Sequence, residues 1–490
     1  MFVALTPLVI PLLTAIFALF ARRSRPLQHQ VALMGAAGGV ACTAALFYRV
    51  WTQGPIVVGM SGWPAPFGIM VVVDTLSASL TLTTSLVHLA ITGHGLASSD
   101  EDRRRSDFWP LANTMVMGVQ GAFITGDVFN LYVWFEVLLL SSFVLVALGN
   151  TRPQVEAASK YVVLNLLSSV MFLLGIALLY GSTGTLTLAD LARAVREPGQ
   201  VQYLPFIAVL FVAGFGLKAA MFPFSTWIPS AYGAPPATLA ALLAGLLTKV
   251  GIYSFLRVGT LLFHGPVEGF GELLLGGAIV SIIIGAIGTM AQLRLRGIIV
   301  HTVVFAVGFM LLGLGVGTAQ SLEATIAYLI SDMLVVTALV LYGGEVERIT
   351  GETDLAGMGG IYRDHPFLAL GFLATAFSVA GFPPLIGFWG KVALLMALIE
   401  DGHIVLTLTA LLGSAVVLVA VGLAWSRGLW KPAPKPPVDP GMERGRIIPL
   451  GLLSLLILGF SFNPQPLFKV AHRAATELID VEGYIQRVMP

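Results

Sequence analysis

The sequence has little charge and almost no cysteine. Of its 490 residues, 11% are Asp, Glu, Lys or Arg, whereas soluble domains carry about 25%. The net charge of +1 provides no basic field that could hold nucleic acid. The single cysteine, Cys42, excludes a disulfide framework and an iron–sulfur cluster held by the usual four thiolates of one chain. These deficits exclude an ordinary cytosolic enzyme, a disordered protein and a nucleic-acid binder.

What the sequence has in abundance is apolar residues, at 57%. They form long runs without the ten-residue alternation of a membrane barrel, and about 20 apolar residues suffice for one helical crossing of a bilayer. We therefore predict an all-α polytopic membrane protein of about 14 transmembrane helices. The predicted spans are 2–20, 31–50, 71–93, 110–126, 128–148, 161–180, 203–230, 235–257, 270–292, 297–317, 323–343, 366–400, 403–425 and 447–462.

The distribution of basic residues predicts the topology. No basic residue precedes the first apolar run, and Arg22, Arg23 and Arg25 follow it, so this run is not expected to be a cleaved signal peptide. With the N terminus outside, most Lys and Arg residues, Arg103–Arg105 among them, fall in cytoplasmic connections. We expect a multi-pass protein of the cell (inner or plasma) membrane with both termini outside. The tail 463–490 looks amphipathic and is expected on the outer surface or against a neighbouring subunit.

A few ionisable residues remain inside the apolar runs. A charged side chain at the bilayer centre costs roughly 2.5–3.5 kcal/mol on insertion scales, so such residues are expected to face water or a partner. Any one of them could simply snorkel or lock two helices together, and a lone histidine can hydrogen-bond a neighbouring helix. Taken as a set, they indicate an ion path. The candidate proton-relay residues are Glu136, Lys218, Lys249, His301, Asp332 and Lys391.

Prolines interrupt two of the predicted helices close to these lysines. Pro223 follows Lys218, whereas Pro383 and Pro384 precede Lys391. Proline removes a backbone donor and clashes with the preceding turn, so both helices are expected to break at mid-membrane. Broken helices beside charged residues are how many transporters build their ion sites.

The two breaks also suggest an internal repeat. Two units of five spans each carry the broken helix in fourth place, and an odd number of spans per unit forces an inverted orientation. We predict N-terminal helices over 1–109, a first five-helix repeat over 110–257, a second over 258–426, and a linker, last helix and outer tail over 427–490.

Two long motifs carry a family resemblance. One runs from Phe215 through Lys218, Pro223 and Pro235-Pro236 to Lys249-Val-Gly-Ile-Tyr253, and the other reads Val379-Ala-Gly-Phe-Pro-Pro-Leu-Ile-Gly-Phe-Trp-Gly-Lys391. They resemble the signature of the antiporter-like subunits shared by respiratory complex I, membrane-bound hydrogenases and multisubunit Mrp cation/proton antiporters. The length fits the Mrp branch.

The resemblance implies roles for particular residues. Glu136 and Lys218 would form a gating ion pair, Lys249 the central relay and Lys391 the terminal lysine. Similar proteins usually have His and Lys where this chain has Ser331 and Val336. In that gap, His301, Asp332 and bound water, or another subunit, would have to continue the relay.

The resemblance also implies a function. The chain would be the proton-translocating subunit of a hetero-oligomeric Na+/H+ antiporter, in which inward proton movement drives Na+ export, with no cofactor or metal of its own and no nucleic-acid partner. No cluster of carboxylates and carbonyls marks a Na+ site, so we expect the Na+ path elsewhere in the complex. Two alternatives remain: the equivalent proton-pumping subunit of a redox complex of the complex I or hydrogenase type, and a non-conducting scaffold subunit.

Overall fold

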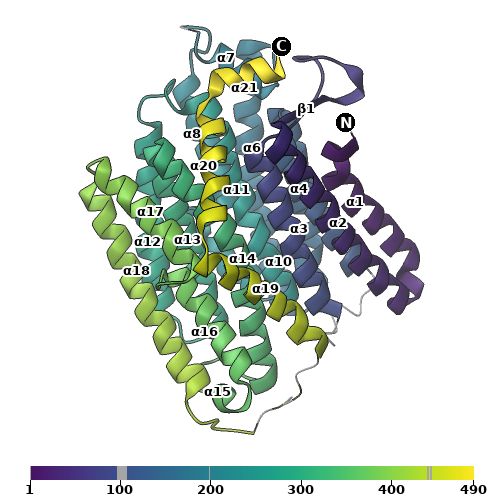
Figure 1. The fold of residues 1–490 in the computed structure, drawn as a ribbon, viewed down its shortest axis with the longest axis vertical. Coiled ribbons are helices and arrows are strands. Elements are labelled where there is room, and N and C mark those ends of the chain that lie inside the picture. Colours follow the sequence, from purple (N-terminus) through teal and green to yellow (C-terminus); the bar gives the residue numbers. More distant parts are fainter. Residues whose placement is uncertain are drawn as a thin grey trace.

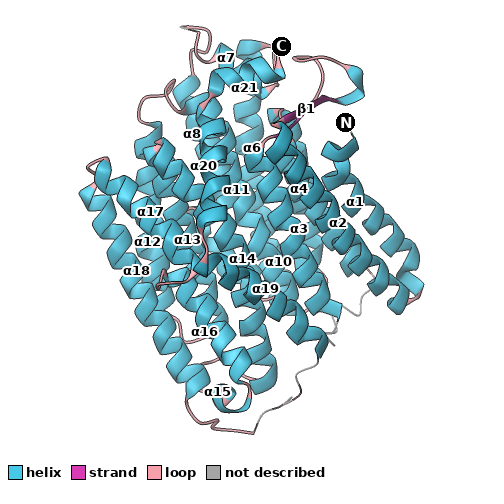
Figure 2. Ribbon diagram, in the orientation of Figure 1, coloured by secondary structure: helices cyan, strands magenta, loops and turns pink. Residues whose placement is uncertain are grey.

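The structure, a computed structural model, is a bundle of long helices that run roughly side by side (Figure 1). It describes residues 2–96, 107–197, 199–436, 438, 441 and 444–489. The predicted cytoplasmic connection with Arg103–Arg105 lies outside these residues. Helices account for nearly all of the regular structure, and one small hairpin lies at the end of the bundle that also holds the two termini (Figure 2).

The first helices enclose this hairpin. They are α1 (Phe2–Phe20), η1 (Ala21–Arg23), α2 (Arg25–Gln53) and α3 (Thr75–Leu96), with β1 (Ile56–Gly59), η2 (Met60–Gly62) and β2 (Met70–Val73) between the last two. The strands are antiparallel, with Ile56 opposite Val73. The span predicted from 71 therefore begins as a strand, because the β-branched run Val71–Val73 pairs with β1 before α3 starts.

The first predicted repeat contains one broken helix and one helix with π-helical turns. Its elements are α4 (Phe108–Ile124), α5 (Val128–Ala147), α6 (Arg152–Thr183), α7 (Leu188–Ala194), α8 (Leu204–Ala219), η4 (Phe224–Trp227), α9 (Ile228–Gly233), α10 (Ala237–Leu242), the π-helix η5 (Leu243–Leu247), α11 (Thr248–Ser254) and the π-helix η6 (Phe255–Phe263). The helical stretch that contains Lys249 continues through the predicted boundary at 257 to Phe263.

The second predicted repeat is followed by three C-terminal helices. The elements are α12 (Phe270–Ala291), α13 (Leu295–Val316), α14 (Ala319–Thr350), α15 (Ile361–Asp364), α16 (Pro366–Ala380), α17 (Ile386–Glu400), α18 (Ile404–Trp425), the π-helix η7 (Ser426–Trp430), α19 (Arg444–Phe462), α20 (Gln465–Ile479) and α21 (Val481–Val488).

The helical membrane fold is confirmed, but the count of 14 spans is not. Among the described residues, 12 helices are long and apolar enough to cross a membrane. Two of the predicted spans fall short for physical reasons. Helix α4 has 17 residues, and the predicted span 366–400 is divided into α16 and α17, of 15 residues each.

Both predicted helix breaks are present. Helix α8 ends at Ala219 and the left-handed Ala220 (φ 63°), before Pro223. Helix α16 ends at Ala380 and the left-handed Gly381 (φ 89°), before Pro383 and Pro384. A left-handed residue is a common helix terminator. Helix α8 follows α7 at one end of the bundle and α16 follows α15 at the opposite end (Figure 1), so the two broken helices run in opposite directions, as an inverted repeat requires.

The C-terminal tail packs on the chain itself. Helix α20 lies along α14 and α3 and buries one face, with Leu467, Ala471 and Leu478 among its buried residues. The Glu477 carboxylate accepts hydrogen bonds from the Thr75 backbone N–H and hydroxyl, both at 2.8 Å. The N and C termini lie at the same end of the bundle (Figure 1), as the predicted topology requires.

Candidate functional site

Helix α14 is the axis around which the candidate relay residues gather. It packs against α3, α10, α13, α16, α17, α19 and α20, and nearly all of its membrane-spanning part is buried. Tyr328 and Asp332 are four residues apart on this helix and therefore share one face. The face of a buried helix that carries a carboxylate needs a cationic partner.

Lys249 supplies that partner. Its ammonium nitrogen lies 2.8 Å from Asp332 Oδ2, and both side chains are 1% exposed. The same ammonium donates a hydrogen bond to the Ala244 carbonyl at 2.9 Å. Ala244 lies in η5, and single π-helical turns often occur at functional sites. The structure thus joins two of the predicted relay residues directly.

Lys391 is held by the broken end of α16. Its ammonium donates to the carbonyls of Val379 at 2.7 Å and Ala380 at 3.2 Å. These belong to the last turn of a helix, whose carbonyls lack intrahelical partners and form the negative end of the helix dipole. The ammonium also lies 4.3 Å and 4.4 Å from the ring centroids of Phe305 and Phe309, within the range of a cation–π contact. Among the described residues, no carboxylate forms an ion pair with Lys391.

Tyr328 lies between these two lysines. Its ring centroid is 5.7 Å from the Lys391 ammonium, and its sequence position is one helical turn from Asp332. Its hydroxyl is buried without a hydrogen-bond partner within the described part of the chain. Sequence reasoning missed Tyr328, although its spacing of four from Asp332 is a signal that could have identified it. Ser331 only bonds the Tyr328 carbonyl, at 2.8 Å, and Val336 is buried among apolar residues.

Lys218 and Glu136 lie near one another without direct contact. The Lys218 ammonium donates to Ser169 Oγ at 3.2 Å and lies 5.4 Å from the ring of Phe135, the residue before Glu136. Glu136 is half-buried, and its Oε1 has no hydrogen-bond partner among the described residues. Its charge acts on Lys218 through space. The gating ion pair between these two residues stays a prediction.

Helix α5, which carries Glu136, is fixed at its start by Asp127. The Asp127 carboxylate caps the helix by accepting a hydrogen bond from the Asn130 N–H at 2.7 Å. Asp127 precedes the membrane span and is buried, and this burial raises the pKa of its carboxyl group to about 6, in opposition to the capping hydrogen bonds.

His301 is not connected to the lysines. Its Nδ1 lies 2.8 Å from the Gly297 carbonyl of its own helix, and its half-buried ring packs against Gly288 of α12. No contact among the described residues joins His301 to Lys249, Asp332 or Lys391.

Side chains satisfy the backbone at both breaks. After α8, the Trp227 indole donates to the Leu217 carbonyl at 3.0 Å, and Ser281 Oγ accepts from the Phe222 N–H at 2.9 Å. After α16, the Trp389 indole donates to the Ser461 carbonyl and Ser461 Oγ accepts from the N–H at the start of α17, both at 2.9 Å. Backbone groups freed at membrane depth thus find protein partners.

A further buried ion pair joins Asp74 and Arg257, 2.5 Å apart, with side chains only 4% and 3% exposed. Arg257 also contacts the hydroxyls of Tyr253 at 3.3 Å and Ser77 at 3.4 Å. Sequence reasoning assigned Arg257 to an outer connection and Asp74 to the interface. That assignment of Arg257 is wrong, because η6 continues to Phe263 and the Asp74 carboxylate neutralises the buried guanidinium.

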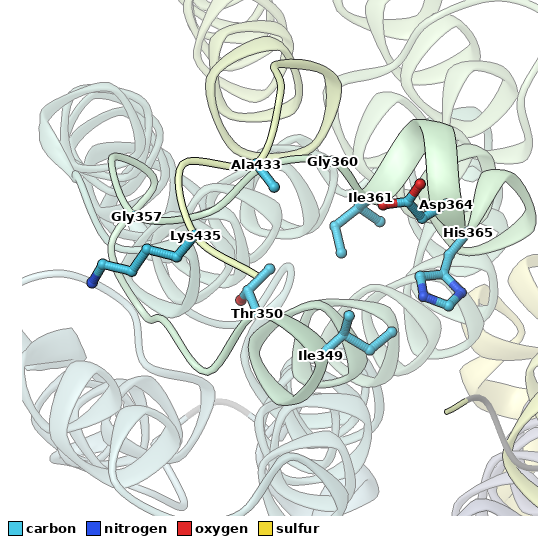
Figure 3. Close-up of a pocket in the computed structure, with 10 residues that line it drawn as sticks. Ile349, Thr350, Gly357, Gly360, Ile361, Asp364, His365, Ala433 and Lys435 are labelled. Atoms are coloured by element: carbon cyan, nitrogen blue, oxygen red, sulfur yellow. The ribbon is translucent and has the colours of Figure 1, made fainter. Parts of the chain in front are cut away.

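A cleft of about 540 Å³ opens at the opposite end of α3. In its wall, Glu345 accepts from Arg348 at 2.9 Å and Arg446 at 3.2 Å and lies 3.0 Å from His94 Nε2. A smaller pocket of about 220 Å³ lies beside α15, with Lys435 on the side opposite Asp364 and His365 (Figure 3), and contains none of the predicted relay residues. Within the described residues, no group of three or more His, Cys, Asp or Glu side chains could hold a metal ion.

Comparisons with known proteins agree with this arrangement. The family described as NADH:quinone oxidoreductase/Mrp antiporter, transmembrane, matches residues 125–417. A Na(+)/H(+) antiporter subunit of Bacillus subtilis (strain 168) is 36% identical over 486 residues, which cover 99% of this chain and 98% of the relative. The protein of the same name from Alkalihalophilus pseudofirmus is 35% identical over 491 residues, with the same coverage.

Solved structures share the fold over the whole chain. A chain of the Mrp complex from Dietzia sp. DQ12-45-1b superimposes with a TM-score of 0.93 at 28% identity, covering 100% of this chain and 99% of that one. A chain of the membrane-bound sulfane sulfur reductase, an archaeal respiratory membrane complex, gives 0.91 at 25% identity, covering 99% of both. A chain of respiratory complex I from Thermus thermophilus gives 0.86 at 22% identity, which shows the fold alone.

Proposed function

We propose a transport function from the premise that the chain belongs to the NADH:quinone oxidoreductase/Mrp antiporter family of transmembrane subunits. The chain is the proton-translocating membrane subunit of a multisubunit Na+ (monovalent cation)/H+ antiporter. Its full-length similarity to two bacterial proteins named as subunits of Na(+)/H(+) antiporters supports this assignment over the other members of the family.

The observation that carries the proposal is the buried Lys249–Asp332 pair on the central helix, with Lys218 and Lys391 at the flanking helix breaks. Buried ion pairs rarely stabilise a fold more than apolar residues of the same volume would. Ionisable residues inside membranes are expensive and mostly mark ion paths. Three buried lysines on three helices around one carboxylate therefore support a path for protons.

The pair imposes an order on proton movement. If a proton leaves the Lys249 ammonium, Asp332 becomes an uncompensated buried charge, which is strongly unfavourable. Departure of one proton must therefore be matched by arrival of another near Asp332. This coupling allows Lys249 to pass protons in either direction without leaving a stable empty intermediate, while Lys218 and Glu136 control access from one side.

We further propose that Tyr328 continues the path where the usual His and Lys are replaced by Ser331 and Val336. Its hydroxyl is buried, has no hydrogen-bond partner among the described residues, and belongs to the side chain that touches both the Asp332 face and the Lys391 site. A hydroxyl both donates and accepts a hydrogen bond, so with water it can relay a proton between Asp332 and Lys391. His301 lies off this line, and we keep it only as a candidate on the α12 side.

In the assembled complex, the two five-helix units 110–257 and 258–426 carry the proton path, and proton entry is coupled to Na+ export through other subunits. The chain itself is not an enzyme. We place it in the cell membrane with both termini outside and the Na+ path in a neighbouring subunit.

Antiport in everted membrane vesicles tests the proposal, with the complex expressed whole and its assembly checked by co-purification. Lys249→Ala and Lys218→Ala should each abolish Na+-dependent dissipation of a proton gradient. Lys160→Ala is the matched control, because Lys160 is 55% exposed on α6 and pairs only with Glu156. If both buried-lysine variants assemble and transport like the control, the chain is a scaffold and the proposal fails.

A second candidate is the proton-pumping subunit of a redox complex, favoured by the 0.91 TM-score with a chain of the sulfane sulfur reductase complex. The proteins that co-purify with this chain separate the two. Flavin or iron–sulfur proteins in stoichiometric amounts would favour the redox complex, and small membrane proteins alone would favour the antiporter.

A further inference from the structure

Helix α3 carries a row of buried polar residues that the relay through α14 does not use. They recur every three or four residues and so lie on one face of the helix. The row consists of Ser77, Thr81, Thr84, His88 and Thr92 and ends against the backbone of Gly95. At 1.5 Å per residue it extends over about 27 Å, close to the ~30 Å thickness of a hydrocarbon core.

Three consecutive members of this row lack hydrogen-bond partners among the described residues. Thr84 Oγ1, His88 Nε2 and Thr92 Oγ1 are all buried and unpaired. The His88 side chain belongs to a residue that is only 4% exposed. A buried polar atom without a partner costs about 1–3 kcal/mol, so one such atom is a defect, but a row of them indicates a shared partner.

Helix α4 presents a matching row to the same face. Gln120 donates to Ser85 of α3 at 3.1 Å, and the Trp109 ring lies against Gly95, so these two residues fix which side of α4 faces α3. Asn113 falls between them on that side. Gln120 Oε1, Asn113 Oδ1 and Trp109 Nε1 are likewise buried without partners in the described part of the chain. The α3–α4 interface therefore contains two facing rows of unsatisfied donors and acceptors.

Both ends of this interface meet charged groups. At one end, Ser77 Oγ accepts from the Arg257 guanidinium of the buried Arg257–Asp74 pair. At the other, Thr238 of α10, whose hydroxyl is also unpaired among the described residues, lies beside Gly95 and directly follows Ala237 in the wall of the 540 Å³ cleft that contains His94, Glu345 and Arg446.

We propose that the α3–α4 interface is a hydrated proton branch that links the cleft at His94 and Glu345 to the Arg257–Asp74 pair, with His88 as its titrating member. Water fits because successive unpaired atoms are about 4.5–6 Å apart along the helix, a gap that one water with two to four polar partners spans. Between Ser77 and Thr92 the row holds no carboxylate, so it offers no compensating charge for a resident metal cation.

The proton step at His88 is balanced without any other reactant. The unprotonated ring nitrogen accepts a proton from a hydronium or water on one side, forming N–H as that O–H breaks, and the opposite ring nitrogen then releases its proton to water on the other side. The two ring nitrogens have distinct roles in such a transfer. The neutral ring is restored as the other tautomer and resets by rotation. That the moving species is a proton rests on the proposed function, whereas the hydration does not.

Cysteine accessibility tests the hydration directly. The chain has a single cysteine, so Cys42→Ser gives a cysteine-free chain in the assembled complex. Thr84→Cys and Thr92→Cys place thiols on the row, and Val87→Cys, which is fully buried next to His88 on another face, is the control. In native membranes, 2-aminoethyl methanethiosulfonate should modify the first two several times faster than the control. Asn113→Cys on α4 replaces either row variant that fails to assemble.

Equal and slow modification of all three thiols would show a dry interface and overturn the proposal, as would fast modification of the Val87→Cys control. His88→Gln then tests the titrating role. It preserves a donor and an acceptor but cannot transfer a proton, so antiport should fall across the whole pH range while the Thr84→Cys thiol stays reactive. A wild-type rate in His88→Gln would remove His88 from the path. Loss of antiport function by the proposed relay would not change the labelling pattern, so the two failures are distinguishable.

Discussion

The buried pair of Lys249 and Asp332 allows stability and transport to be separated by a double-mutant cycle. Removing one partner of a buried ion pair leaves an uncompensated charge and typically costs about 3–5 kcal/mol. Both side chains are 1% exposed, so solvent cannot replace the lost partner. Lys249 retains the Ala244 carbonyl at 2.9 Å, and we therefore expect Asp332→Leu to destabilise less than Lys249→Met, which leaves the carboxylate with no cation.

The combined variant Lys249→Met/Asp332→Leu should recover most of this loss, because apolar residues of similar volume often replace a buried pair at no net cost. The assay is the fraction of detergent-solubilised complex that stays monodisperse after heating, measured for the wild type, both single variants and the double variant. The exposed pair Glu156–Lys160 gives the matched control cycle, in which we expect a coupling of only about 0–1 kcal/mol.

Antiport by the same four proteins completes the test. The double variant should be nearly as stable as the wild type and yet transport no protons, since both ionisable groups are gone. Additive losses of stability in the cycle would refute the ion pair. A stable double variant that still performs antiport would refute the relay through α14.

Three further predictions follow from groups around this site. Tyr328→Phe should slow antiport without lowering heat stability, because the hydroxyl it removes has no partner among the described residues; an unchanged rate would exclude Tyr328 from the path. Burial raises the pKa of Asp127 from 3.8 to about 6, so the folded chain holds this proton more tightly than the unfolded chain and loses stability as the pH rises between these values. Asp127→Asn, which keeps a capping oxygen, should therefore stabilise the protein at pH 7 and have little effect at pH 4, and heat stability measured at both pH values checks this. Arg257→Ala should destabilise by about 3–5 kcal/mol and Arg257→Ala/Asp74→Ala by much less, whereas equal losses would show that the pair is not the reason.

The breaks and the intramembrane lysines could be predicted because each rests on local chemistry. Pro223, Pro383 and Pro384 remove backbone donors wherever they occur in a helix, and Lys218 and Lys391 are conspicuous in apolar runs. The sequence could not show what holds these groups. Lys391 is bound by carbonyls that exist only because α16 ends at Ala380.

Partners across the bundle depend on packing rather than on local pattern. Lys249 and Asp332 were both predicted relay residues, but their contact depends on how α11 and α14 meet. Arg257 was misplaced because a hydropathy window ends at the first charge, whereas the helix continues where Asp74 neutralises that charge. The polar row of α3 was overlooked because threonines lower the hydropathy of a span only slightly, and periodicity reveals them only once a facing helix is known.

The two broken helices hold their lysines unequally, and this asymmetry assigns the moving part. Lys391 is fixed by two carbonyls and two aromatic faces, whereas the carbonyl at the end of α8 is occupied by Trp227 and the Lys218 ammonium keeps one hydroxyl, Ser169 Oγ, at 3.2 Å. The less firmly held ammonium is the one that can swing, which fits Lys218 as the gate. Ser169→Asp would place a carboxylate beside it and should fix it in place, slowing antiport in vesicles while stabilising the complex against heating. Ser169→Ala, which removes the hydroxyl and adds no charge, should not slow antiport. If Ser169→Asp transports at the rate of Ser169→Ala, the gate does not depend on movement of Lys218.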